Sequence, residues 1–179
     1  PSMLPRLTQY EALTRGEFKK RRIRPEVTVT VVVISLALQV HLPLYFVDLG
    51  KFDLPLLVVI YLVSLRKNVT SGLLIGAAMG LAQDSLTQGP IGIFGILKTV
   101  VAYLASTVGR FIKVDLAVVR IILTAILFVV HQLLFWIMKS ALLGSEISSN
   151  LVETIIFTPL HAGVAVLLFQ FLDRFHKDP

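Results

Sequence analysis

The fold is decided by residues 71–112, SGLLIGAAMGLAQDSLTQGPIGIFGILKTVVAYLASTVGRFI. Its first part spaces Gly72, Gly76 and Gly80 four residues apart, so all three lie on one face of a helix. In lipid, hydrophobic burial no longer drives helices together, and close backbone approach at small residues takes over. The stripe therefore predicts a helix against which a second helix packs. That neighbour is either a helix of this chain, which is favoured because the bundle must first close on itself, or a partner protein.

Two ionisable residues lie within this apolar stretch. Asp84 follows the glycines and stands beside Gln83, and Lys98 lies inside the next apolar run. Between them is a turn made of Gly89, Pro90, Ile91 and Gly92. Like the glycine stripe, Gly89, Pro90 and Gly92 are expected to serve helix packing or partner binding. Charged groups within a membrane usually pair or line a cavity. The sequence predicts that Asp84 and Lys98 face one another beneath the turn, either as a structural ion pair or as the floor of a cavity for a ligand, lipid or partner.

The composition is that of an integral membrane protein. Of the 179 residues, 55% are hydrophobic and 16% are charged, and the mean hydropathy is +0.81. Soluble domains carry about 25% charged residues. Cysteine is absent, which excludes disulfides and thiolate metal sites. The net charge of +6 comes from basic residues beside apolar segments, so a membrane surface, and not nucleic acid, is the expected anionic partner.

Six apolar segments predict an all-α fold, a six-helix transmembrane bundle over residues 27–172. The expected spans are residues 27–47, 54–65, 69–86, 91–112, 116–138 and 151–172. The second segment gives only about 18 Å of helix against a membrane core of about 30 Å. Residues 54–86 are therefore two short crossings or a re-entrant pair. Crossings are favoured, because a re-entrant pair would place Arg66 and Lys67 at mid-membrane.

The basic residues predict the orientation of the six spans. With six crossings both tails, residues 1–26 and 173–179, share one side. That side collects Arg6, Arg15, Lys19, Lys20, Arg21, Arg22, Arg24, Arg66, Lys67, Arg110, Lys113, Arg120, Arg174 and Lys177. Excess positive charge marks the cytoplasmic side, so both termini are expected there. The run Lys19, Lys20, Arg21, Arg22 and Arg24 is a topology signal or a site for anionic lipid.

No motif in the sequence predicts catalysis. There is no Gly-x-Ser-x-Gly elbow, no His-Glu-x-x-His and no phosphate-binding Gly-Lys-Ser/Thr loop. The four histidines stand on different segments. His131, Gln132 and His161 are expected to make hydrogen bonds between helices. We therefore expect neither enzymatic activity nor a cofactor.

Four short motifs in this stretch resemble the family of the rod shape-determining protein MreD. They are GLLIG at residues 72–76, GLAQD at 80–84, GPIG at 89–92 and KTVVAYL at 98–104. The resemblance implies a non-enzymatic membrane scaffold of the bacterial cell-elongation machinery, which directs peptidoglycan synthesis at the inner membrane. It also implies a bitopic partner, MreC, together with MreB, RodA and a class B penicillin-binding transpeptidase.

The same family is similar in fold to the S components of energy-coupling-factor transporters, which bind vitamins. This similarity gives the rival interpretation, a substrate-binding S component. S components commonly carry an Ala-x-x-x-Ala face on the first span for docking their coupling subunit. Here the corresponding run, VTVTVVVISLAL at residues 27–38, has Ala37 alone. This departure favours the scaffold.

Overall fold

The computed structural model describes residues 22–23, 25–46, 50, 52–64, 68–87, 90–111, 117–144, 151–174 and 176–177. In these residues the chain forms six helices: α2 (Pro25–Tyr45), α3 (Leu54–Ser64), α4 (Val69–Leu86), α5 (Ile93–Phe111), α6 (Ala117–Leu143) and α7 (Leu151–Asp173). The predicted all-helical class is confirmed. In the described part of the chain α2, α5, α6 and α7 are long and apolar enough to cross a membrane.

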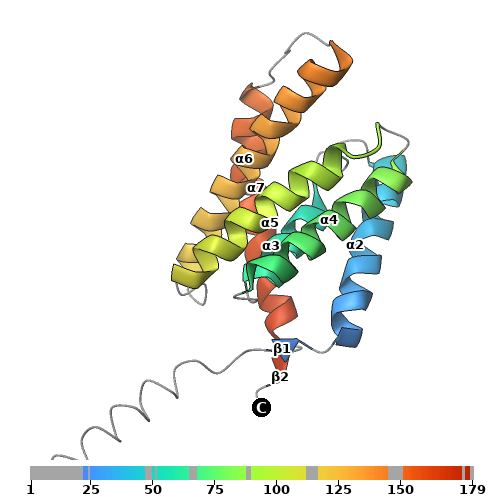
Figure 1. The fold of residues 1–179 in the computed structure, drawn as a ribbon. Helices are drawn as coiled ribbons and strands as arrows, with labels where there is room; N and C mark the ends of the chain where they lie inside the picture. The colour runs from blue at the N-terminus through green and yellow to red at the C-terminus, as the bar shows by residue number, and fades with distance from the viewer. Residues whose placement is uncertain are drawn as a thin grey trace, which may run out of the picture.

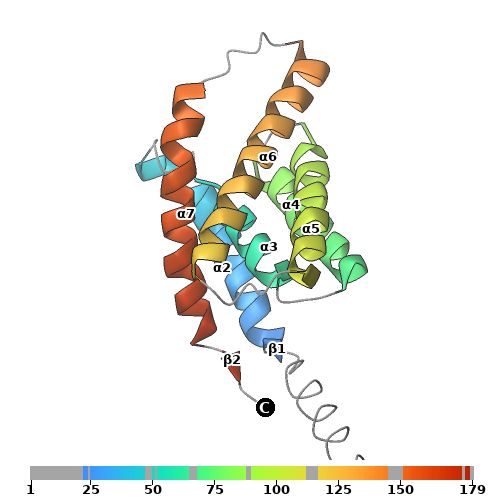
Figure 2. The same ribbon diagram turned by 90° about the vertical axis from the view of Figure 1, so that its left-hand side faces the viewer.

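The chain segments just before the first helix and just after the last helix pair in a very short sheet (Figure 1). Strand β1 (Arg22–Ile23) precedes α2 and pairs antiparallel with β2 (His176–Lys177), which follows α7. The chain therefore enters and leaves the bundle at the same end. At the opposite end, α6 and α7 extend beyond the other helices (Figure 1, Figure 2).

Helices α4 and α5 form a tight hairpin along the glycine stripe. A Cβ added at Gly76 would lie 2.5 Å from the carbonyl oxygen of Lys98 and 2.6 Å from the Cβ of Ala102. A Cβ at Gly80 would overlap the carbonyl oxygen of Phe94. The α4 backbone thus rests directly on the α5 backbone, as small residues permit in membrane helices. The neighbour of the stripe is a helix of this chain.

Small residues also bring α3 close to this hairpin. A Cβ at Gly72 would lie 3.0 Å from Val63 of α3 and 3.2 Å from Ser106 of α5. A Cβ at Gly109 would lie 2.9 Å from the carbonyl oxygen of Ser64. Helices α3, α4 and α5 therefore pack with little side-chain volume between them.

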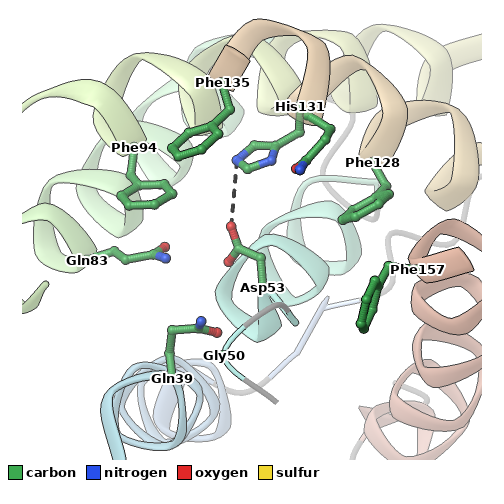
Figure 3. A pocket seen from close by; sticks show the side chains of 10 residues that line it. Gln39, Gly50, Asp53, Gln83, Phe94, Phe128, His131, Phe135 and Phe157 are labelled. Carbon is green, nitrogen blue, oxygen red and sulfur yellow. Dashed lines mark ion pairs between the residues drawn. The ribbon is translucent and has the colours of Figure 1, made fainter. Parts of the chain in front are cut away.

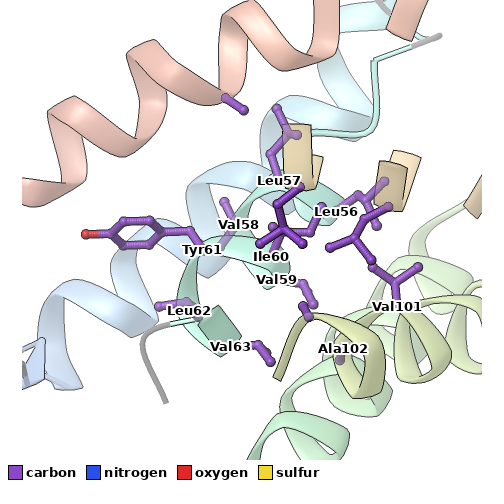
Figure 4. Packing of buried hydrophobic residues seen from close by; sticks show 14 of the residues in the cluster. Leu56, Leu57, Val58, Val59, Ile60, Tyr61, Leu62, Val63, Val101 and Ala102 are labelled. Carbon is purple, nitrogen blue, oxygen red and sulfur yellow. The ribbon is translucent and has the colours of Figure 1, made fainter. Parts of the chain in front are cut away.

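Helix α3 is the centre of the core (Figure 4). All of its residues from Pro55 to Ser64 are buried, and Leu56, Leu57, Val59, Ile60 and Val63 are completely inaccessible. Helices α2, α4, α5 and α7 all contact it. Eleven residues give only about 16 Å of helix. A short helix is tolerated here because protein, and not lipid, surrounds it.

A polar cluster closes the bundle near β1 and β2. Arg120 of α6 pairs with Asp173 of α7, with 2.6 Å between Nη1 and Oδ2. The Tyr61 hydroxyl of α3 donates to the other carboxylate oxygen at 2.9 Å. These contacts link α3, α6 and α7 through one acidic side chain.

Candidate functional site

The most deeply buried charge of the described residues is Lys98, whose side chain is fully inaccessible. Its Nζ pairs with Oδ2 of Asp53 at 2.5 Å. The second carboxylate oxygen of Asp53 accepts the backbone N–H of Leu56 at 3.0 Å and so caps the start of α3. The Asp53 carboxylate thus both neutralises the charge of Lys98 on α5 and caps the N-terminus of α3.

Asp84, the partner predicted for Lys98, binds elsewhere. Its carboxylate accepts the backbone N–H groups of Gly92 and Phe94 at 3.0 Å and of Gly95 at 2.9 Å. The first N–H groups of a helix have no partner within the helix and favour a negative charge. The predicted Asp84–Lys98 ion pair is therefore wrong, because Asp84 is used to cap α5.

The turn before α5 depends on glycine for its conformation. Gly92 has a φ of 105°, a region that side chains disfavour, and a Cβ there would meet nothing within 4 Å. Gly92 thus reverses the backbone and presents its N–H to Asp84. It does not make the predicted helix packing within the described part of the chain, and the alternative, partner binding, stays a prediction. Pro90 is exposed, and Gly89 lies outside the described residues.

We expect Asp84→Ala to loosen the α4–α5 turn. The change leaves three N–H groups at the α5 N-terminus without their acceptor, and loss of such a cap costs about 1–2 kcal/mol. Thermal unfolding of the purified chain in detergent should show a lowered midpoint. Ser85→Ala is the matched control, since the exposed Ser85 hydroxyl donates only to Leu81 of its own helix. Equal midpoints for the two variants would contradict the capping role.

Two histidines flank Asp53. His161 accepts the backbone N–H of Asp53 at Nε2, 3.2 Å away, and donates from Nδ1 to the Phe157 carbonyl at 2.9 Å. His161 thus makes the predicted contact between segments. His131 is different: its Nε2 lies 3.6 Å from Oδ2 of Asp53, and neither ring nitrogen has a hydrogen-bond partner in the described part of the chain.

A cavity of about 200 Å³ opens beside this cluster (Figure 3). Its polar lining is Gln39, Asp53, Gln83, His131 and Gln132. Its aromatic lining is Phe94, Phe128, Phe135 and Phe157. The lining thus includes the predicted Gln83, whereas Asp84 and Lys98 are not part of it. The acidic residue of the lining is Asp53, and not Asp84 as predicted.

Asp53 was not among the predicted site residues, although the sequence carries a local signal for it. Asp53 directly precedes the entirely apolar helix α3, and an Asp before an apolar run with an early proline, Pro55, is typical of a helix N-cap. Gln39 was also missed; its Oε1 accepts the backbone N–H of Leu54 at 3.1 Å and ties α2 to the same helix start.

The predicted basic run lies almost wholly outside the described residues. Lys19, Lys20, Arg21 and Arg24 are not described, and of Arg22 only the backbone in β1 is. Its role as a topology signal or a lipid site stays a prediction.

Fold and site together define a polytopic helical membrane protein whose buried charges join its helices. The family model of the rod shape-determining protein MreD matches residues 20–175. The chain belongs to the MreD family, which confirms the resemblance seen in the sequence and a role in cell shape. No curated protein and no solved structure gives a match.

Proposed function

We propose that this chain is a non-enzymatic scaffold of the bacterial cell-elongation machinery and that it binds an MreC-like bitopic protein through transmembrane helix contacts. The observation that carries the proposal is the family match, which extends over residues 20–175. RodA, a class B penicillin-binding transpeptidase and MreB belong to the same proposed assembly.

The buried charges support a structural role. Lys98 is held by Asp53, Arg120 contacts Asp173, and Asp84 caps α5. Each of these contacts joins two helices or a helix and a turn. The side chains that would be most costly to bury are thus engaged in holding the bundle together.

The partner helix in this proposal packs on an outward face of the bundle. The glycine stripe of α4 is covered by α5, so it offers no free groove to a partner. Helix α2 is the least enclosed of the long helices, and Ser35 is its one buried residue. Its exposed apolar side chains include Val29, Val33, Ile34 and Leu38.

We further infer six crossings of the bacterial inner membrane with both termini in the cytoplasm. The pairing of β1 with β2, which joins the two ends of the bundle, supports an even number of crossings. The concentration of basic residues in the tails and in the loops on that side supports a cytoplasmic location.

Co-purification tests the scaffold. The tagged full chain is co-expressed with an MreC-like protein and extracted in mild detergent, and the partner is expected to elute with it. A partner whose single membrane helix is replaced by a polyleucine helix is the matched control and should be lost. If the chain elutes alone, partner binding is refuted. If the control partner is retained, contact through the membrane helix is refuted.

A further inference from the structure

The cavity beside Asp53 contains polar groups that the protein itself leaves unused. Gln83 and His131 are both more than nine-tenths buried, and both line the cavity. Gln83 Oε1 and His131 Nδ1 have no hydrogen-bond partner in the described part of the chain, and His131 Nε2 faces Oδ2 of Asp53 at 3.6 Å, beyond hydrogen-bond distance. A buried polar group without a partner costs about 1–3 kcal/mol, so two lining residues with such groups indicate a place for a molecule that binds them.

The charge of the cavity favours a neutral ligand. Asp53 is the acidic group of the lining, and its charge is already balanced by Lys98 at 2.5 Å. The remaining polar lining consists of amides and an imidazole. An ion entering this space would meet no free opposite charge to offset its lost hydration.

The hydrogen-bonding pattern requires a ligand that both donates and accepts. Gln83 Oε1 is an acceptor, and a neutral imidazole at His131 offers one donor and one acceptor. Gln132 adds an amide to the same space. Hydroxyl groups meet this requirement because each one donates and accepts.

The rings of the lining favour a ligand with an apolar face. The Phe94 ring is stacked with Phe135 at 5.8 Å and with His131 at 6.4 Å between centroids. Phe128 and Phe157 close another side of the cavity (Figure 3). Such a mixture of aromatic walls and a few polar groups is typical of small-molecule sites. A sugar ring combines C–H faces with a rim of hydroxyls, and a single ring suits a volume of about 200 Å³.

We propose that this cavity binds one neutral sugar ring, with its hydroxyls on Gln83 and His131 and its C–H face on Phe94 and Phe135. The ring is either a free monosaccharide or the headgroup of a glycolipid. The test below is made on the purified chain without a partner, so its outcome does not depend on the scaffold proposal.

The chain has no cysteine, which permits a direct test by labelling. The full-length Gln132→Cys variant, purified in a phosphocholine detergent, is treated with a polar maleimide in the presence of methyl glucoside or octyl glucoside. Sugar at about ten times its dissociation constant should slow labelling about tenfold by mass action. Slower labelling is called protection here. If methyl glucoside and octyl glucoside both protect the thiol, a free sugar is a ligand. Protection by octyl glucoside alone, and not by octylphosphocholine, identifies a lipid headgroup.

Two further substitutions in the Gln132→Cys background locate the protection. His131→Leu should abolish it, and protection is taken as the ratio of the labelling rates with and without sugar in that same variant. His41→Leu, the same change at an exposed position of α2, should leave protection intact. Phe157→Cys, at a lining position that the proposed sugar contacts do not use, replaces Gln132→Cys as the labelled variant if the latter does not elute as a single species.

Several outcomes would overturn the proposal. If neither glucoside slows labelling, the cavity binds no sugar and holds only water. If the thiol never reacts, the cavity is closed to the reagent. Protection that survives His131→Leu would place the sugar elsewhere. Protection by a co-expressed MreC-like protein but by neither glucoside would assign the space to a partner side chain.

Discussion

Lys98→Met is expected to lower the free energy of unfolding by about 3–5 kcal/mol, the largest loss for a single change in this chain. Methionine fills much of the space of the lysine, but it leaves the carboxylate of Asp53 buried without its counter-charge. Asp53→Asn alone should be similarly harmful, because the lysine then has no carboxylate in contact with its Nζ. The double variant should recover most of the loss, since neither charge remains buried. Denaturant titration of the purified chain in detergent measures all four free energies.

Two controls make this cycle specific. Arg174→Met removes an exposed basic side chain just after α7 and should change stability by no more than about 0.5 kcal/mol. Asp84→Asn combined with Lys98→Met should show no such recovery, because Asp84 caps α5 and does not pair with the lysine. If stability recovered with Asp84→Asn but not with Asp53→Asn, Asp84 would be the partner of Lys98, as predicted from the sequence.

The extents of the helices were largely predictable, and the differences have local causes. The predicted bounds of α4 agree with the structure, where the Asn68 side chain caps the helix by accepting the N–H of Thr70. Helix α5 begins at Ile93, two residues later than predicted, because Gly92 has a positive φ. Helix α6 runs to Leu143, beyond the predicted end at 138, since Lys139 does not break a helix and the next positive φ is at Gly144.

The candidate site was predictable only in part. The cost of a buried charge predicts that Lys98 has an acidic partner, but it does not say which one. Asp53 lies 45 residues away, on a segment whose position depends on how α3 packs in the bundle. Asp84 is nearer in sequence, yet the N–H groups of α5 take its carboxylate. The cavity draws residues from several helices, so no sequence periodicity could reveal its shape.

Gly80→Ala is expected to separate α4 from α5. The added methyl would overlap the carbonyl oxygen of Phe94 and approach the Cα of Gly95 to 2.6 Å. Both are backbone atoms of a helix and cannot turn aside as a flexible side chain would. Overpacking of this kind costs about 1–3 kcal/mol, and the displaced α5 would also move Lys98 relative to Asp53.

Gly163→Ala on α7 is the matched control for the same chemical change. A Cβ at Gly163 would meet nothing within 4 Å. Alanine is also a better helix former than glycine by about 1 kcal/mol, so this variant should be neutral or slightly more stable. The midpoint temperature of thermal unfolding in detergent should therefore be lowered by Gly80→Ala and not by Gly163→Ala. If both variants unfold at the temperature of the unchanged chain, the close contact between α4 and α5 does not limit the stability of the bundle, and the glycine stripe has another role.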